Sequence, residues 1–309
     1  MLARRRDTLY LNVFGKERRT REIMLPNYKL SNGVEIPQVG FGTWQIPDGP
    51  DTENAVLAAI QSGYNHVDTA YAYYNEKGVA SAVEKSGVAR EDLFITTKLW
   101  NTEQGYEETL ENFELSLENL NTDYVDLYLV HWPQTFVFFD EYPQRMWDTW
   151  RAFEELYQAK KVRAIGLSNF LQHHIETLME KATVYPMVDQ LEIHPGYNQS
   201  DIVDYCQKNG IVVECWSPLA NGKMLSEDSL LTEIGEKYGK TAAQVALRWS
   251  NQRGLLPLPR SVKPERIAEN LAFFDFELSE EDMQRITGMP ETWFSGYHPD
   301  HLDFLDGLG

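Results

Sequence analysis

Hydrophobic and polar positions follow one repeating pattern over most of the chain. From residue 38 onward, a short apolar run, a polar turn and an amphipathic segment succeed one another eight times. The apolar runs predict strands over residues 38–44, 66–70, 93–99, 124–130, 162–167, 187–193, 211–217 and 255–259. The amphipathic segments predict helices over residues 51–62, 76–86, 105–120, 144–160, 171–181, 200–209, 264–273 and, in two pieces, 228–252. Eight strand–helix units without a GxGxxG after the first strand favour a closed (β/α)₈ TIM barrel over a Rossmann sheet.

Both ends of the chain add elements outside this repeat. Asn32-Gly33 stands between two short alternating runs, which predicts a β-hairpin with a two-residue turn before the barrel. Ser279 precedes three acidic residues, which suits the N-cap and first turn of an extra C-terminal helix. A short tail follows, and its segment 290–298 is a candidate to lie across the site. No linker rich in Gly, Pro or Ser interrupts residues 24–309, so we predict a single domain.

The composition narrows the possible partners. The chain has 309 residues and a formal net charge of -19, which repels phosphate backbones, so no nucleic-acid partner is expected. No apolar stretch is long enough to cross a membrane. The cysteines Cys206 and Cys215 form no CxxC motif, which favours free thiols in the reducing cytoplasm.

The first 23 residues differ from the rest in charge. They carry seven basic and three acidic side chains, a local excess of +4. Three interpretations remain open: a disordered arm, a targeting extension, or translated upstream sequence before a natural start at Met24. We favour the last, because regular structure is predicted soon after Met24.

Polar residues stand where several predicted strands end. Asp68, Lys98 and His131 end three successive strands, and Tyr73 follows five residues after Asp68. In a barrel of this kind the carboxyl ends of the strands meet at one mouth, where the chemistry takes place. A lysine buried there requires an adjacent carboxylate. We therefore expect these four side chains to converge.

Together these four groups can protonate an oxygen atom. A free phenol, with a pKa of about 10, is a weak acid, and an adjacent ammonium is expected to lower the pKa of Tyr73. Tyr73 could then donate a proton to a carbonyl oxygen that His131 orients by a hydrogen bond. The set contains no nucleophile, so it requires a hydride, for which a nicotinamide cofactor is the favoured source. His298 and His301 could form a pair of metal ligands, but no complete ligand set is apparent around them, so no metal site is predicted.

These residues lie in a series of motifs that resembles the aldo-keto reductase family, over nearly all of residues 28–300. The motifs are GFGTW at 40–44, DTA at 68–70, TKLW at 97–100, DLYLVHWP at 126–133 and IGLSNF at 165–170. The resemblance is closest to the bacterial branch that includes 2,5-diketogluconate and methylglyoxal reductases. It implies NADPH-dependent reduction of aldehydes or ketones, a monomer, and a catalytic tetrad of Asp68, Tyr73, Lys98 and His131.

The resemblance also implies a cofactor site without a Rossmann domain. The nicotinamide would contact Ser168, Asn169 and Gln190 and stack on Trp216; the remaining implied contacts are Gly42, Thr43, Trp44, Asp68, Ser217, Pro218, Leu219, Asn221, Glu269 and Asn270. The sequence itself adds a basic cluster before a predicted helix start, in an otherwise acidic chain. Such a helix start attracts anions, so a 2′-phosphate is expected at Arg260, Ser261, Lys263 and Arg266, and Val262 among them is a further implied cofactor contact.

Aromatic residues near the strand ends predict the substrate pocket. It would be formed by Trp44, Tyr73, Trp100, His131 and Trp132, which suits a small or medium carbonyl compound. Two other functional classes are the alternatives. A cofactor-binding regulatory subunit, similar to potassium-channel β subunits, would keep the same tetrad. A metal-dependent hydrolase would need an HxH in the first strand, and residues 38–44 contain no histidine.

Overall fold

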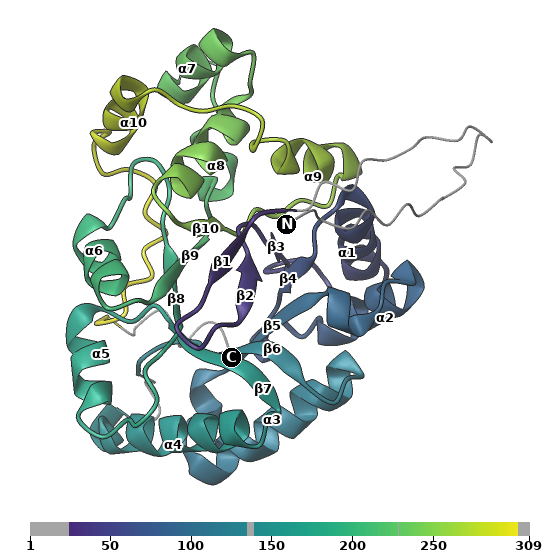
Figure 1. Cartoon of the computed structure of the whole chain (residues 1–309), viewed down its shortest axis with the longest axis vertical. Coiled ribbons are helices and arrows are strands. Elements are labelled where there is room, and N and C mark those ends of the chain that lie inside the picture. The colour runs from purple at the N-terminus through teal and green to yellow at the C-terminus, as the bar shows by residue number, and fades with distance from the viewer. Residues whose placement is uncertain (1–24, 135–138, 228, 302–309) are drawn as a thin grey trace, which may run out of the picture.

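The computed structural model describes residues 25–134, 139–227 and 229–301 (Figure 1). Residues 1–23, predicted as a separate extension, lie outside the described residues. Eight parallel strands follow one another around a barrel in sequence order. They are β3 (Phe41–Gly42), β4 (His66–Asp68), β5 (Phe94–Leu99), β6 (Val125–Val130), β7 (Val162–Ser168), β8 (Val188–Glu192), β9 (Val212–Trp216) and β10 (Leu256–Pro257).

Hydrogen bonds between the first and last strand segments close the barrel. Gly40 N donates to Pro257 O at 3.1 Å, and Gly42 N donates to Pro259 O at 3.2 Å. Pro257 and Pro259 have no N–H group and cannot donate a hydrogen bond back to β3, so few hydrogen bonds form between the first and last strands. This explains why β3 and β10 are much shorter than the apolar runs from which they were predicted. The prediction of a (β/α)₈ barrel is confirmed.

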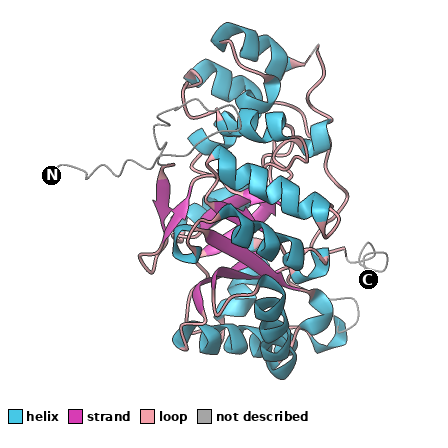
Figure 2. Cartoon of the chain, turned by 90° about the vertical axis from the view of Figure 1, so that its right-hand side faces the viewer, coloured by secondary structure: helices cyan, strands magenta, loops and turns pink. Residues whose placement is uncertain are grey.

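Helices surround the strands in the alternation that the sequence predicts (Figures 1 and 2). They are α1 (Pro50–Ser62), α2 (Glu76–Ser86), α3 (Tyr106–Leu120), α4 (Gln144–Gln158), α5 (Gln172–Met179), α6 (Ser200–Lys208), α7 (Leu230–Tyr238), α8 (Ala242–Gln252), α9 (Pro264–Leu271) and the extra α10 (Glu280–Thr287). Among the described residues, no helix is both long and apolar enough to span a membrane.

The N-terminal hairpin lies at one end of the barrel, outside the helical ring (Figure 2). Its strands are β1 (Asn27–Lys29) and β2 (Glu35–Pro37), which pair antiparallel. The predicted two-residue turn is wrong. That turn requires positive φ at both central residues, whereas Gly33 has φ 89° and Asn32 is not in the left-handed region. Gly33 N instead donates to Leu30 O, and Leu30 N to Val34 O, which makes a wider loop ending in glycine.

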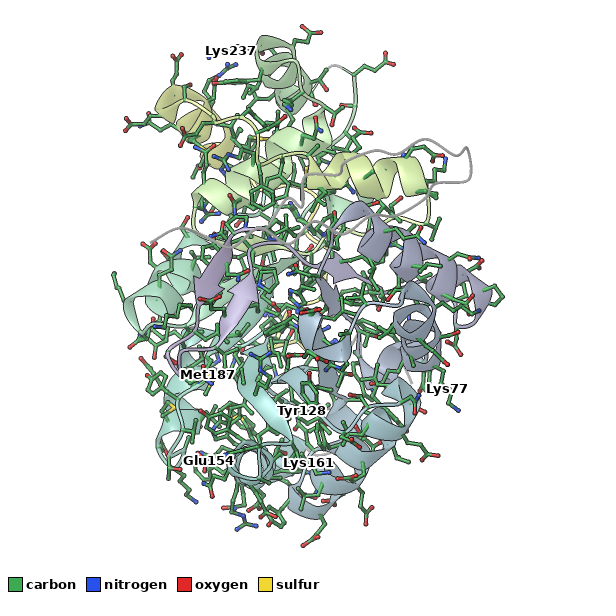
Figure 3. All side chains as sticks on the ribbon, turned by 45° about the vertical axis from the view of Figure 1, so that its right-hand side comes forward. Lys77, Tyr128, Glu154, Lys161, Met187 and Lys237 are labelled. Atoms are coloured by element: carbon green, nitrogen blue, oxygen red, sulfur yellow. The ribbon has the colours of Figure 1, made fainter. Side chains whose placement is uncertain are left out.

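The apolar core lies between the strands and the helices. Tyr128 on β6, labelled in Figure 3, is fully buried and stacks on Phe153 of α4 at 4.4 Å between ring centroids. Lys77 and Lys237 lie on the outer surface (Figure 3). Side chains alternate along a strand, so the strand residues next to outward-facing ones such as Tyr128 point into the barrel interior. Several of the inward-facing residues of the barrel are polar. The interior is therefore where the candidate chemistry lies.

Candidate active site

Three of the four predicted catalytic side chains meet through the amine of Lys98. This side chain is fully buried, and its Nζ donates to Asp68 Oδ1 at 2.8 Å and to Thr69 O at 2.9 Å. It also donates to the hydroxyl of Tyr73 at 3.4 Å. The ends of β4 and β5, with the loop that follows β4, thus place a carboxylate, an ammonium and a phenol in direct contact.

A short loop after β4 brings Tyr73 back over the barrel mouth. Residues 71–73 form a single 3₁₀ turn in which Tyr73 N donates to Ala70 O at 3.0 Å. Buried Asn75 holds this loop from below, since its Nδ2 donates to Thr43 O and Ile46 O at 3.0 and 2.9 Å. The loop geometry is therefore set by buried hydrogen bonds rather than by solvent contacts.

His131, the fourth predicted residue, follows β6 and faces the same mouth. Its ring lies 5.6 Å from the ring of Tyr73 and 5.2 Å from that of Trp100, between centroids, both edge-on. Burial and the positive charge of Lys98 hold the pKa of His131 well below its ordinary value. The imidazole is therefore neutral at pH 7 and can donate a hydrogen bond without adding charge.

The expectation that Lys98 would lower the pKa of Tyr73 is wrong in its net direction. Burial raises the pKa of Tyr73, and this outweighs the opposing effect of the Lys98 ammonium. Burial alone would lower the pKa of Lys98, but Asp68 and Tyr73 more than compensate, so that pKa is raised. At neutral pH the site therefore holds a protonated phenol beside a charged amine, which is the state a proton donor requires.

A cleft of about 870 Å³ begins at this mouth and extends to α9. It is lined by every predicted site residue except Lys98, which lies behind Asp68 and Tyr73, and Thr43. The Thr43 side chain is fully buried, and its Oγ1 donates to Asp68 O at 2.9 Å, so it supports the site from behind. Tyr297 lines the cleft as well, and the lining residues that sequence reasoning missed are Ala72, Gly222, Leu225, Glu227, Thr232, Glu236, Lys240, Thr241, Ala242, Ala243, Leu258 and Pro259.

Tyr297 belongs to the tail segment that the sequence marked as a candidate to lie across the site. Its ring lies 6.4 Å from that of Trp44. The tail is fixed on β8, because Ser295 N and Oγ donate to the two carboxylate oxygens of Glu192 at 3.0 and 2.6 Å. The tail thereby closes one side of the aromatic pocket.

The residues expected around a nicotinamide ring form a hydrogen-bonded group on β7, β8 and β9. Trp216 Nε1 donates to Asn169 Oδ1 at 2.8 Å, and Asn169 Nδ2 donates to His131 O at 3.0 Å. Gln190 Nε2 donates to Asp68 Oδ2 at 2.9 Å. Its amide oxygen is the part of Gln190 that can accept from a carboxamide in the cleft.

The basic cluster lies at the far end of the cleft. Arg260, Lys263 and Arg266 are exposed, and none of them forms an ion pair with any residue that the structure describes. Ser261 Oγ accepts from Lys263 N at 3.1 Å just before Pro264 begins α9. Unpaired cations at a helix start, joined by one cleft to a proton donor, fit a dinucleotide that carries an extra phosphate.

A second polar cluster joins α5 to the tail. Asp300 Oδ1 lies 2.9 Å from His173 Nε2 and 3.1 Å from His174 Nε2, a spacing that would suit a metal ion. However, Leu171 N donates to His174 Nδ1 at 3.2 Å, so the proton of the neutral ring lies on Nε2 and points at Asp300. This arrangement is a hydrogen-bonded contact that holds the tail.

The chain is similar to known reductases over most of its length. A model of the aldo/keto reductase family matches residues 38–291. Glyoxal reductase of Bacillus subtilis is 50% identical over 276 residues, covering 89% of this chain and 97% of that protein. Methylglyoxal reductase DkgA of Salmonella typhimurium is 38% identical over 275 residues, covering 89% and 97%. The crystal structure of a Bombyx mori aldo-keto reductase in complex with NADP has a TM-score of 0.80 and 32% identity, covering 89% of this chain and 96% of that one. The predicted resemblance to the family is confirmed, and this chain belongs to the aldo/keto reductase family.

Proposed function

We propose that this chain reduces small aldehydes and ketones to alcohols, with NADPH as cofactor and Tyr73 as proton donor. The observation that carries the proposal is one continuous cleft, which joins the Tyr73–Lys98–Asp68 contact to the cations at the start of α9. The relatives named glyoxal reductase and methylglyoxal reductase support small dicarbonyl compounds as the substrate class.

When bound, NADPH supplies a hydride to the carbonyl carbon. Tyr73 gives its hydroxyl proton to the carbonyl oxygen as negative charge develops there. The Lys98 ammonium, 3.4 Å away, stabilises the phenolate that remains, and Asp68 keeps Lys98 charged. The neutral imidazole of His131 donates a hydrogen bond to the same oxygen and orients it.

The other predicted roles remain part of this proposal. Trp44, Trp100 and Trp132 wall the substrate pocket, and Trp216 stacks on the nicotinamide. Arg260, Lys263 and Arg266 hold the 2′-phosphate, a function that suits the bidentate geometry of arginine. Ser217, Pro218, Leu219 and Asn221 follow the pyrophosphate, and Glu269 and Asn270 contact the adenine.

We also propose a cytoplasmic monomer with one domain over residues 24–309 and no nucleic-acid partner. The two cysteines, Cys206 and Cys215, are free and buried, which supports a reducing compartment. The net charge of -19 supports the absence of nucleic-acid binding. The regulatory-subunit alternative is not favoured, because the proton-donor contacts are complete and the similar proteins include named reductases.

The proposal is tested by following NADPH absorbance with methylglyoxal as substrate. Tyr73→Phe should abolish reduction and leave NADPH binding, measured by tryptophan fluorescence, intact. Tyr74→Phe is the matched control, because Tyr74 is 69% exposed and adjacent in sequence, and it should keep wild-type turnover. NADPH binding by a wild-type protein that reduces no carbonyl would favour the regulatory alternative; equal loss of binding and turnover in Tyr73→Phe would contradict the role of Tyr73.

A further inference from the structure

Glu214 on β9 is a buried carboxyl group inside the barrel to which neither the mechanism nor the sequence motifs assign a role. Its side chain is fully buried. Its Oε2 accepts from Gln190 Nε2 at 2.8 Å, and the same nitrogen donates to Asp68 Oδ2 at 2.9 Å. The amide of Gln190 therefore bridges Glu214 and Asp68.

The bridge continues to the proton donor. Asp68 Oδ1 accepts from Lys98 Nζ at 2.8 Å, and Lys98 Nζ contacts the Tyr73 hydroxyl at 3.4 Å. An uninterrupted series of side-chain contacts thus runs from β9, through β8, β4 and β5, to the cleft. These four strands surround the same barrel interior (Figure 1).

The barrel interior holds two carboxyl groups, Asp68 and Glu214, near one cation, Lys98. The groups around Glu214 are Asp68 and His66 on β4, Lys98 on β5 and the neighbouring thiol of Cys215. Burial, followed by the positive charge of Lys98, lowers the pKa of His66 to about 3, so this ring stays neutral although its Nε2 lies 3.9 Å from Glu214 Oε1. Burial also raises the pKa of the Cys215 thiol. Lys98 is therefore the single positive charge that acts on Glu214 among the described residues, since Arg253 acts on the Cys215 thiol instead.

Burial, with the added negative charge of Asp68, raises the pKa of Glu214 to about 8. At neutral pH the second carboxyl group thus holds a proton. In this state the oxygen of Glu214 still accepts a hydrogen bond from Gln190. Asp68 is then the one ionised carboxylate that the Lys98 ammonium neutralises, and the ammonium can still stabilise negative charge on Tyr73. An ionised Glu214 would place a second negative charge in the interior and oppose the one that develops on Tyr73 as its proton leaves.

We propose that Glu214 is a positioning residue for proton donation: it fixes Asp68 through Gln190, and it must stay neutral for Tyr73 to release its proton. The inference rests on the proposed reductase function. Glu214 keeps its own proton throughout, because the proton that reaches the substrate oxygen comes from the Tyr73 hydroxyl. The proposed role depends on two separate properties of Glu214: its oxygen accepts a hydrogen bond, and its carboxyl group carries no charge.

Two variants and a control separate these properties in the full-length protein. Glu214→Gln keeps an acceptor but cannot ionise, whereas Glu214→Met has similar volume and removes both. Glu76→Gln is the matched control, since Glu76 is also a buried glutamate but bonds Thr97 and Asn119 outside this series. For each protein, kcat and kcat/KM for NADPH-dependent reduction of methylglyoxal are measured between about pH 6 and pH 10.

In the wild type and in Glu76→Gln, kcat/KM should fall above about pH 8. In both Glu214 variants the fall should move upward by about one pH unit or more. At pH 7, kcat should be lower in Glu214→Met than in Glu214→Gln, because only the former leaves Gln190 without its acceptor. A packing role alone would change kcat without moving the fall.

Two results would overturn the inference in distinguishable ways. A fall that stays at the wild-type pH in whichever Glu214 variants fold would overturn the role of Glu214 and leave the reductase function intact. A wild-type protein that reduces no carbonyl compound at any pH would overturn the proposed function, and this inference with it.

Discussion

Replacing Lys98 by methionine tests whether the buried ion pair holds the site together. Methionine keeps most of the side-chain volume but removes the ammonium, which makes three hydrogen bonds, to Asp68, Thr69 and Tyr73. Asp68 is only 4% exposed, and among the residues that the structure describes its carboxylate would then keep one side-chain donor, the amide of Gln190. Leaving one partner of a buried pair uncompensated costs about 3–5 kcal/mol.

For 309 residues, at about 2.1 cal/mol/K of unfolding entropy per residue, each kcal/mol of lost stability lowers Tm by about 1.5 °C, so Lys98→Met should lower Tm by about 5–8 °C. Thermal unfolding followed by circular dichroism measures this shift. Lys77→Met is the control, because Lys77 lies exposed on α2, and its Tm should stay within about 2 °C of the wild type.

A double variant separates charge burial from lost packing. Asp68→Asn combined with Lys98→Met removes both charges, so its Tm should exceed that of Lys98→Met alone. Two independent, additive losses, or a Lys98→Met protein as stable as the Lys77→Met control, would refute the reasoning that this pair is energetically coupled.

Two further predictions concern the phosphate site and acid stability. Arg266→Ala should raise the Kd for NADPH about tenfold and leave that for NADH nearly unchanged, measured by fluorescence titration, because a charged hydrogen bond to phosphate is lost; equal weakening of both would contradict 2′-phosphate recognition. Asp282 sits in α10, where burial opposes ionisation but hydrogen bonds from Lys237, Tyr238 and Ser279 prevail and lower its pKa to about 2. Because the folded-state pKa is depressed, the stabilisation is present above about pH 4 and is lost as pH falls toward 2. Asp282→Asn should therefore lower Tm at pH 7, and this deficit should shrink as the pH approaches 2.

The barrel was predictable because its strand–helix repeat leaves a strong periodic signal, but its seam was not. The apolar runs at 38–44 and 255–259 extend well beyond β3 and β10. Periodicity records burial, whereas a strand also requires N–H donors, and Pro257 and Pro259 have none. The prediction of a two-residue hairpin turn was wrong because residue type shows only which conformations are allowed. Asn32 and Gly33 can both adopt the left-handed conformation, but only Gly33 does so.

The candidate site was predictable as far as strand ends determine it. Asp68, Lys98 and His131 lie at the mouth because parallel strands bring their carboxyl ends together. The direction of the Tyr73 pKa was not predictable, because it depends on how much burial opposes Lys98, and only the three-dimensional packing decides that. Glu214 was not identified as a site residue from the sequence, because it is a single acidic residue within an apolar run. Its position two residues before Trp216 on one strand already places both side chains on the inner face.

The net charge of -19 and the proposed phosphate site are compatible because they act over different distances. At physiological ionic strength, the field of exposed charges decays over about 8 Å, so acidic groups elsewhere on the surface barely affect a phosphate in contact with arginine. Glu227, Glu236 and Glu269, however, line the same cleft. Binding there must then depend on direct contacts by Arg260 and Arg266 rather than on a general positive potential. Such contacts favour a compact phosphate monoester over an extended polyanion, whose remaining charges would meet the acidic surface.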